Sequence, residues 1–200
     1  MEIKRTQAER SATTRAALVA ASRGLFAEHG YAALSTDQIA KAAGVTRGAL
    51  YHQFAGKEEL FAAVFEQVES EIAERIDAYI EAAAPSDVES MLGANIDAWL
   101  ATCAEPEFHR IALIEAPAAL GWERWREVGL RYGVGLVESA LRSLIDAGLV
   151  ADRPVRPLAH VLVGALDEAA LYCAQAEDRV RATAEVCDAL LAVLTGLLAR

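Results

Sequence analysis

The sequence predicts an all-α protein in which an N-terminal three-helix head is followed by a larger helical bundle. Apolar residues recur every three or four positions along most of the 200-residue chain, which is the spacing of amphipathic helices. Glycine and proline interrupt this pattern at intervals, and no alternating run is long enough to build a sheet. Within residues 35–54, two short helical patterns meet at a turn. We therefore expect the head to comprise residues 1–56 and the bundle to comprise residues 57–200.

The first helix is expected to begin at Ser11 and to end at Gly30. Leu18 and Phe26 fall on one face of this helix at helical spacing, so this face closes a small core. Glycine tolerates the left-handed conformation that ends a helix, which is why Gly30 marks the boundary. The residues before Ser11 are expected to form a loose arm whose cations are Lys4, Arg5 and Arg10.

Residues 35–54 are predicted to form a helix-turn-helix. A hydroxyl of Ser35 or Thr36 can accept a hydrogen bond from a free amide of the first helical turn, so one of them caps the first helix. Gly44 then ends that helix, and Thr46 caps the next one. The second helix is expected to bury Leu50 and Phe54 and to leave Arg47, Gly48, Tyr51 and His52 facing outward.

Beyond Gly56 the pattern is helical almost without interruption. Apolar residues recur every four positions from Leu60 to Ile80, which predicts a long helix over 57–83. Pro106, Pro117 and Gly148 are expected to separate the helices that follow. These helices are expected at 87–104, 107–116, 122–147, 157–176 and 178–199.

The chain shows no pattern of a membrane or secreted protein. Its longest apolar stretches are much shorter than the roughly 20 residues that a bilayer requires. Glu2 and Glu9 stand where a secretory signal would be apolar or basic. We therefore expect a cytoplasmic location and no membrane partner.

The outward side of the second short helix suits double-stranded DNA. The major groove admits one helix, whose N-terminal end meets base edges while its flanks meet phosphates. Arg47 lies at that end, and Gly48 has no side chain, so the backbone can approach the duplex closely. Lys57 falls near the start of the next helix, where an ammonium and free amides can together hold a phosphate. The alternative is a purely structural hairpin, which also carries a turn glycine and outward polar residues.

A wider pattern lies between positions 14 and 61, formed by Phe26, Gly30, Tyr31, Ser35, Ile39, Ala40, Ala43, Gly44, Val45, Gly48, Tyr51, Phe54, Lys57 and Leu60. It resembles the TetR family of one-component helix-turn-helix transcriptional regulators. The resemblance implies that the head is a DNA-binding domain and that the bundle binds a small-molecule ligand and dimerises. It also implies that the DNA-contacting residues are Thr36, Thr46, Arg47, Gly48, Tyr51, His52 and Lys57.

The distribution of charge agrees with a DNA-binding head. The whole chain has a formal net charge of −10 and an isoelectric point near 4.9, values that ordinarily argue against a nucleic-acid partner. Up to Gly56, however, seven basic residues stand against four acidic ones, a balance of +3 that leaves −13 for the remainder. A basic head on an acidic body would orient the molecule toward phosphates. Solubility alone is the alternative explanation of the acidic body.

The last two predicted helices each carry a broad apolar face, which predicts a homodimer. Two helices cannot cover such faces by themselves, so the same pair from a second copy would complete a four-helix interface. A helix-turn-helix also favours a dimer, because two heads read a palindrome. The alternative is that these faces pack on the core of their own chain. The interface residues expected are Leu158, Val161, Leu162, Ala165, Ala169, Leu190, Leu191, Leu194 and Leu198.

The middle helices concentrate aromatic residues, from which a chamber for a small-molecule effector could be built. Pockets for small ligands are mostly apolar with a few polar anchors, and His109 and Asp167 could supply such anchors. The alternative is that the aromatic side chains form ordinary core. The effector-contacting residues expected are Trp99, Cys103, Phe108, Ile111, Glu115, Trp125, Glu168 and Tyr172.

We expect no catalytic residues, no metal site and no cofactor. The sequence lacks a Gly-x-Ser-x-Gly elbow, a phosphate-binding glycine-rich loop and a His-Glu-x-x-His pair. Its three widely spaced cysteines are expected to be buried apolar side chains, with thiol sensing as the alternative. The chain is therefore interpreted as a homodimeric TetR-like repressor that a small molecule releases from a palindromic operator. A helical adaptor that contacts only proteins is the alternative, and it would leave Arg47, Tyr51 and Lys57 without a role.

Overall fold

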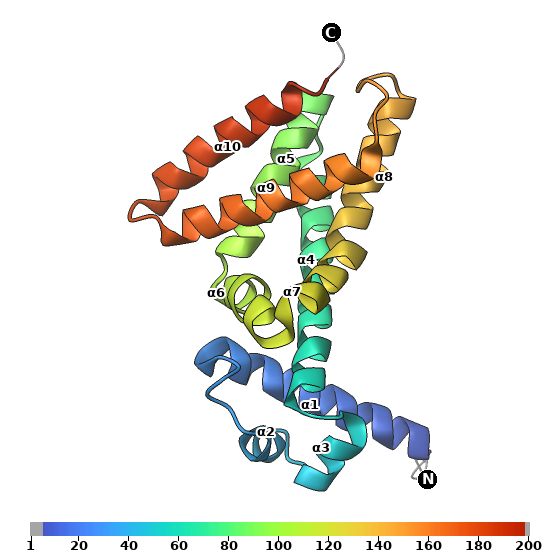
Figure 1. Ribbon diagram of the computed structural model, residues 1–200, viewed down its shortest axis with the longest axis vertical. Coiled ribbons are helices and arrows are strands. Elements are labelled where there is room, and N and C mark those ends of the chain that lie inside the picture. The colour runs from blue at the N-terminus through green and yellow to red at the C-terminus, as the bar shows by residue number, and fades with distance from the viewer. Residues whose placement is uncertain (1–5, 199–200) are drawn as a thin grey trace. The chain divides into compact units, whose positions relative to one another are not determined.

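The computed structural model describes residues 6–198 and builds them from helices (Figure 1). Within this range the only extended pairing is an isolated bridge between Val150 and Leu198, so the predicted all-α class is confirmed. The helices in chain order are α1 (Gln7–His29), α2 (Thr36–Ala42), α3 (Arg47–Gln53), α4 (Lys57–Ala83), α5 (Val88–Ala104), α6 (Pro106–Phe108), the π-helix η1 (His109–Glu115), α7 (Ala116–Gly129), the π-helix η2 (Leu130–Val134), α8 (Gly135–Asp146), α9 (Val155–Gln175) and α10 (Arg179–Thr195).

Helix α1 begins earlier than the sequence predicted. The hydroxyl of Thr6 accepts a hydrogen bond from the Glu9 N–H at 3.2 Å, and the Glu9 carboxylate accepts one from the Thr6 N–H at 2.6 Å. This reciprocal pair satisfies two amides that would otherwise be free at the helix start. The expectation that Arg10 belongs to a loose arm is therefore wrong, because Arg10 lies in α1. Lys4 and Arg5 lie outside the described residues.

The chain does not break at Pro117, contrary to the prediction. Pro117 is the second residue of α7, and the altered hydrogen-bond pattern of the π-helix before it accommodates the N–H that proline lacks. The π-helix η1 leads directly into α7. The interruption lies instead at Gly121, whose φ of 76° kinks α7. The helical path that was predicted to end at residue 116 therefore continues to the non-helical Gly121, and the second predicted helix follows that break at residue 122.

The other helix ends follow from local chemistry. Helix α4 has the predicted bounds, and Gly148, with a φ of 71°, ends the turn after α8 as expected. The Asp87 carboxylate accepts a hydrogen bond from the Ser90 N–H at 2.8 Å and so caps α5. Asp178 caps α10 in the same way. Helix α10 ends at Thr195, earlier than the predicted residue 199, which lies outside the described range.

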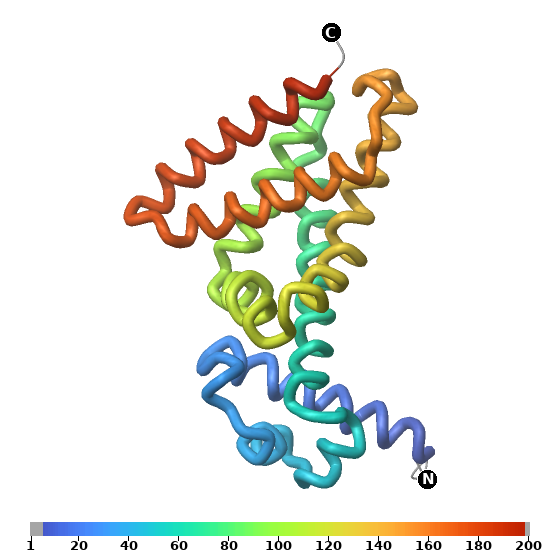
Figure 2. Tube along the Cα trace, in the orientation of Figure 1, coloured from blue at the N-terminus to red at the C-terminus, as the bar shows by residue number. Residues whose placement is uncertain are grey.

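Contacts divide the chain into two compact units. The first unit contains the residues up to Val68 and also the segment Arg110–Trp125, and the second contains Glu69–His109 and the residues from Arg126 onward. Figure 2 allows both paths to be followed by residue number. The first unit thus includes a segment from the middle of the chain. The functional division after Gly56 stays a prediction.

The first unit has a core that α1, α2, α3 and the start of α4 share. The rings of Phe26 and Phe61 meet edge to face with 4.9 Å between centroids, and the ring of Tyr31 lies 5.2 Å from Phe61. Ile39 of α2 and Leu50 of α3 are fully buried. Short helices gain most of their stability from such packing, so this core fixes the position of α2 and α3.

The second unit is built around α5, α8, α9 and α10. Helices α9 and α10 run antiparallel as a hairpin (Figure 2), and α5 packs against both. The Trp99 indole N–H donates to the Leu166 carbonyl at 2.8 Å and joins α5 to α9. By length and composition α9 could cross a membrane, with a mean hydropathy of 1.2, which was not expected from the sequence. Helix α9 packs against α5, α8, α10 and η2.

Gly30→Ala is expected to destabilise the protein by about 2 kcal/mol. Gly30 has a φ of 82° and a ψ of 163°, a conformation that glycine adopts almost alone, and an added Cβ would lie 2.5 Å from Glu115 Oε1. Gly24→Ala is the matched control, because Gly24 lies in α1 with no atom within 4 Å of an added Cβ. This control should stabilise by about 0.5–1 kcal/mol. Urea unfolding measures both free energies, and equal changes would contradict the account of Gly30.

Candidate nucleic-acid interface

The helix-turn-helix forms where the sequence predicted it. The Ser35 hydroxyl accepts a hydrogen bond from the Gln38 N–H at 3.3 Å, and the Gln38 side chain accepts one from the Ser35 N–H at 2.9 Å. Gly44, with a φ of 67°, reverses the chain after α2. The Thr46 hydroxyl then accepts from the Ala49 N–H at 3.1 Å and starts α3. The two caps pair amides that would otherwise be free at the helix starts, and the glycine allows the turn between the helices. The local sequence therefore determines the motif.

One face of this motif is open to solvent. Leu50 and Phe54 point into the core, whereas Thr46, Arg47, Gly48, Tyr51 and His52 are exposed and Thr36 is half-buried. Six of the seven residues predicted to contact DNA therefore lie on α3, beside its start or at the start of α2. The structure brings them together on one side of the motif, and their contact with DNA stays a prediction.

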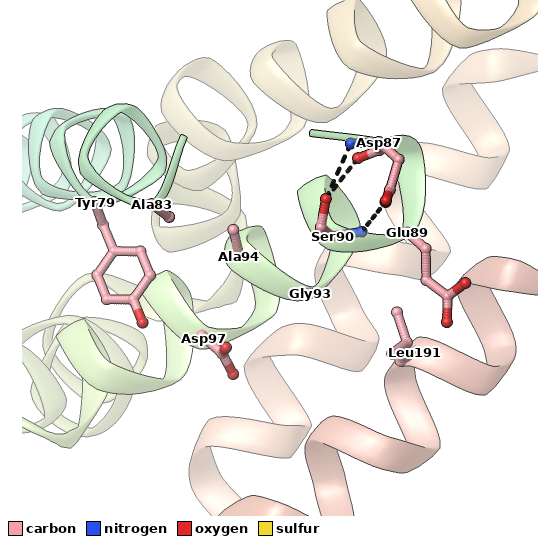
Figure 3. A pocket seen from close by; sticks show the side chains of 9 residues that line it. All are labelled: Tyr79, Ala83, Asp87, Glu89, Ser90, Gly93, Ala94, Asp97 and Leu191. Carbon is pink, nitrogen blue, oxygen red and sulfur yellow. Dashed lines mark hydrogen bonds between the residues drawn. The ribbon is translucent and has the colours of Figure 1, made fainter. Parts of the chain in front are cut away.

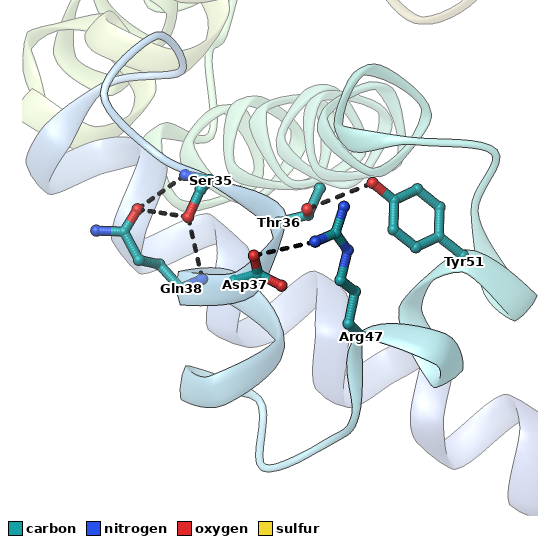
Figure 4. A network of polar contacts seen from close by, with 6 residues as sticks. All are labelled: Ser35, Thr36, Asp37, Gln38, Arg47 and Tyr51. Carbon is teal, nitrogen blue, oxygen red and sulfur yellow. Dashed lines mark hydrogen bonds and ion pairs between the residues drawn. The ribbon is translucent and has the colours of Figure 1, made fainter.

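A polar network links α2 to α3 across this exposed face (Figure 4). Arg47 Nη1 lies 3.2 Å from Asp37 Oδ2, and the Arg47 guanidinium carbon lies 5.5 Å from the centre of the Tyr51 ring. The Tyr51 hydroxyl in turn lies 3.4 Å from Thr36 Oγ1. Asp37 was not among the residues singled out from the sequence, and a carboxylate in the first turn of α2 gave no signal beyond ordinary helix stabilisation.

The network shifts the titration of two exposed groups. The hydrogen bond with Thr36, followed by that with Arg47, lowers the pKa of Tyr51. The hydrogen bond with Tyr51, followed by the charge of Asp37, raises the pKa of Arg47, so its guanidinium stays charged. The exposed face therefore presents a cation that is oriented by two neighbours.

Lys57 differs from the other predicted DNA contacts. Its ammonium donates to the carbonyls of Tyr31 and Leu34, each at 2.8 Å, and lies 4.1 Å from the centre of the Tyr31 ring. These contacts join the start of α4 to the turn between α1 and α2. The side chain thus has a structural role, and its phosphate contact remains a prediction.

The mid-chain segment of the first unit is held by charged side chains at both ends. Arg110 donates to the carbonyls of Ala27 and Glu28 at 3.0 and 2.9 Å, which are free acceptors at the end of α1. The Glu115 carboxylate accepts a hydrogen bond from the Tyr31 N–H at 3.0 Å. At the other end, Arg124 donates to Glu59 on α4 at 2.8 Å. We call the contacts of Arg110 and Glu115 with the end of α1 the α1 clamp.

The residues predicted to contact an effector divide between the two units. Ile111, Glu115 and Trp125 lie in the first, where Glu115 belongs to the α1 clamp and the Trp125 indole N–H donates to the Ala112 carbonyl at 3.0 Å. The second unit holds the other five: Trp99, Cys103 and Phe108, which are buried or half-buried, and Glu168 and Tyr172, which are exposed. That these eight residues share one effector chamber stays a prediction.

A cluster of polar side chains lies within the second unit: Cys103 of α5 is buried, and Glu69 of α4, Arg126 of α7 and Asp167 of α9 are half-buried. Burial raises the pKa of Glu69 to about 7, and the neighbouring Asp167 adds to the shift. Burial also raises the pKa of Asp167 to about 6, although Arg126 Nη1 lies 3.6 Å from its carboxylate and opposes the change. Burial, together with Glu69 and Asp167, raises the pKa of Cys103 well above its ordinary value. A thiol with a raised pKa is a poor nucleophile, which argues against redox sensing at Cys103.

Glu69 was missed in the sequence, although a signal for it exists. It lies four residues after the buried Phe65 and three before the buried Ile72, so it is a carboxylate on the core-facing side of α4. His109, which was singled out as a polar anchor, has a buried Nδ1 atom with no hydrogen-bond partner. Burial, and then the charge of Arg179, lowers the pKa of His109. The second unit thus contains polar groups that are shielded from water, and the Nδ1 atom of His109 lacks a hydrogen bond.

An open pocket of about 540 Å³ lies on the second unit between the end of α4, α5 and α10 (Figure 3). Its wall carries three carboxylates, Asp87, Glu89 and Asp97, of which Asp87 is already used as the cap of α5. None of the predicted effector-contacting residues lines it. Among the described residues there is no group of three or more side chains that could hold a metal ion.

The residues predicted for a dimer interface differ in how far they are buried within their own chain. Leu158, Leu162 and Leu194 pack with the core of their own chain around Val134 and Leu141, which is the alternative weighed for these faces. By contrast, Val161 is 67% exposed. Ala169 is buried, while Ala165, Leu190, Leu191 and Leu198 are half-buried. At helical spacing Val161, Ala165, Glu168 and Tyr172 share one face of α9, which we call the outer face of α9.

Comparison with known proteins places these features among bacterial regulators. Residues 18–64 match the model described as bacterial regulatory proteins of the tetR family, and residues 88–197 match the tetracyclin repressor-like C-terminal domain. The chain is 33% identical to the Transposon Tn10 TetC protein of Escherichia coli over 147 residues, 73% of each chain. It is 43% identical to the HTH-type transcriptional regulator CymR of Pseudomonas putida over 84 residues, 42% of this chain and 41% of CymR.

A solved structure shows the same fold over nearly the whole length. A TetR-family transcriptional regulator from Pectobacterium atrosepticum is 37% identical, with a TM-score of 0.80 over 98% of this chain and 99% of that one. The likeness therefore covers the helix-turn-helix and the helices that follow it.

Glu69→Gln is expected to stabilise the protein at pH 8 by about 2 kcal/mol, an order-of-magnitude value from the pKa shift. Because the folded-state pKa of about 7 exceeds that of the unfolded chain, the native state binds this proton more tightly. The contribution of Glu69 to stability is therefore present below the unfolded pKa and is lost as the pH rises through about 7.

Urea unfolding at pH 5 and pH 8 tests this prediction, with Glu74→Gln, an exposed residue of α4, as the matched control. The wild type and the control should lose more stability than Glu69→Gln between the two pH values. An unchanged pH dependence in Glu69→Gln would show that the carboxyl is not desolvated.

Proposed function

Because this chain belongs to the TetR family of transcriptional regulators, we propose that it is a homodimeric repressor that a small-molecule effector releases from a palindromic operator. The observation that supports this most strongly is the exposed face of α3 on a helix-turn-helix whose other side is packed in a core. On this face Arg47 lies beside Asp37, and Tyr51 lies beside Thr36. We assign the protein no catalytic step and a cytoplasmic location.

The proposed DNA contact uses α3 as the helix that enters the major groove. Arg47 lies at its N-terminal end, where a guanidinium can donate two hydrogen bonds to a guanine edge. Tyr51 and His52 lie farther along the exposed side and can reach phosphate or base edges. The N-terminus of α2 supplies Thr36 and free amides for the DNA backbone.

The proposed dimer uses the outer face of α9 together with exposed residues of α10. Val161 and Tyr172 are 67% and 55% exposed, and Val193 of α10 is 58% exposed. Large exposed apolar side chains at helical spacing favour a partner of the same kind, because a second copy buries the same face on both chains. Dimerisation then sets the distance between two heads.

The proposed release acts through the α1 clamp. Arg110 and Glu115 hold the end of α1 and belong to a segment that is continuous at both of its ends with the second unit. An effector bound among the polar groups near Glu69 and Asp167 would favour one arrangement of these helices over another. A differential affinity of about 1–3 kcal/mol is sufficient for release.

Arg47→Ala is expected to weaken binding to the operator by about 1–3 kcal/mol without changing the unfolding temperature. The side chain is 59% exposed, so its loss removes a DNA contact and little packing. Lys41→Ala is the control, since it removes a charge from exposed α2 and should affect all sequences alike. Fluorescence anisotropy with an operator duplex and a scrambled duplex measures both effects. Full operator affinity in Arg47→Ala would remove the assignment of α3.

Val161→Asp is expected to convert the dimer into a monomer, because a charge on the outer face of α9 would be buried without a partner. Leu136→Asp on α8 is the matched control, with a side chain that is 46% exposed, and should remain dimeric. Sedimentation equilibrium distinguishes the chain mass of 21.4 kDa from twice that value. A dimeric Val161→Asp protein would place the interface elsewhere.

A further inference from the structure

The ion pair between Asp37 and Arg47 is the starting point of this inference, which rests on the proposed operator binding. Both side chains are largely exposed, 62% for Asp37 and 59% for Arg47, and they join two helices across the turn of the motif (Figure 4). An exposed ion pair contributes little to folding stability. We therefore expect this ion pair to affect the binding of DNA more than the stability of the fold.

Asp37 lies where a DNA phosphate would otherwise be attracted. It belongs to the first turn of α2, and its carboxylate pairs with the guanidinium of Arg47 at the start of α3. A phosphate that approaches this guanidinium is repelled by the carboxylate beside it. Binding to DNA of arbitrary sequence depends almost entirely on phosphate contacts, so Asp37 weakens this kind of binding.

The same carboxylate leaves base reading intact. A guanidinium has five N–H donors, and the contact with Asp37 uses Nη1, so other donors remain for a base edge. Asp37 and the Tyr51 ring also restrict the orientation of the Arg47 side chain, which reduces the entropy lost on binding a base. Asp37 therefore lowers the affinity for a specific site less than it lowers the affinity for DNA of arbitrary sequence.

We propose that Asp37 is a specificity-determining residue, which holds Arg47 ready for a base edge and withholds it from phosphates of arbitrary sequence. Such a residue acts by discriminating against wrong partners as much as by attracting the right one. Replacement of the charge alone should therefore make the protein bind DNA of arbitrary sequence more tightly, and so lower its selectivity.

Asp37→Asn tests this proposal, because asparagine keeps the shape and can still stabilise the start of α2. The probes are a duplex enriched by the wild-type protein from a random library and a scrambled duplex of the same composition. The variant should bind the scrambled duplex about fivefold more tightly, and the slope of log affinity against log salt should steepen by about 0.9, equal to one more phosphate contact. Affinity for the enriched duplex should change less than twofold, so the specificity ratio falls.

Two further variants identify the route of the effect. Glu28→Gln makes the same change of charge at an exposed residue of α1, and it should alter neither affinity more than twofold. In an Arg47→Gln background, Asp37→Asn should no longer tighten binding to the scrambled duplex. A persistent effect would mean that Asp37 acts without Arg47 and would overturn the proposal.

The outcomes separate this inference from the proposed function. If the wild type enriches a sequence but Asp37→Asn keeps the same specificity ratio and salt slope, the proposal about Asp37 fails alone. If the wild type enriches no sequence, the proposed operator binding fails and the proposal fails with it.

Discussion

The structure depends on how the free backbone groups at the end of α1 are satisfied. A helix leaves its last carbonyls without partners, and burial makes such groups costly unless they are paired. Arg110 donates to two of these carbonyls, the Lys57 ammonium donates to two carbonyls in the turn that follows, and Glu115 accepts from the Tyr31 N–H. Three charged side chains from distant parts of the chain therefore close the turn from which α2 begins.

The charged side chains of the first unit therefore differ in role, because some bind backbone carbonyls and others are exposed on the surface. Lys57 and Arg110 are engaged by carbonyls, whereas Arg47 lies on the surface with only exposed neighbours. Helix α3 has seven residues and would not persist alone in water, so its position derives from Leu50, Phe54 and the Thr46 cap. The exposed face of α3 thus depends on the core behind it, and its polar side chains remain open to solvent.

The sequence predicted what local chemistry decides. The caps at Ser35 and Thr46, the turn at Gly44 and the long α4 all follow from neighbours within four residues, and each has the expected place. Partners far apart in the chain could not be predicted: Arg110 meets Ala27 across more than eighty positions, and no spacing rule connects them. The break was predicted at Pro117 but lies at Gly121. The π-helix before α7 changes the hydrogen-bond pattern so that Pro117 fits within the helix, and the sequence alone did not indicate this π-helix. The raised pKa of Glu69 likewise depends on burial and on the charge of Asp167, which lies far along the chain on α9.

The central claim is that two copies of the α2–α3 motif read one palindromic site, and selection of duplexes from a random library by the purified wild-type protein tests it most directly. The account predicts enrichment of two inverted half-sites whose centres lie one helical turn of DNA or a multiple of it apart, with affinity that falls as salt rises. Enrichment of a single half-site would contradict the dimer. Retention of all sequences alike, or of none, would contradict sequence-specific recognition by α3.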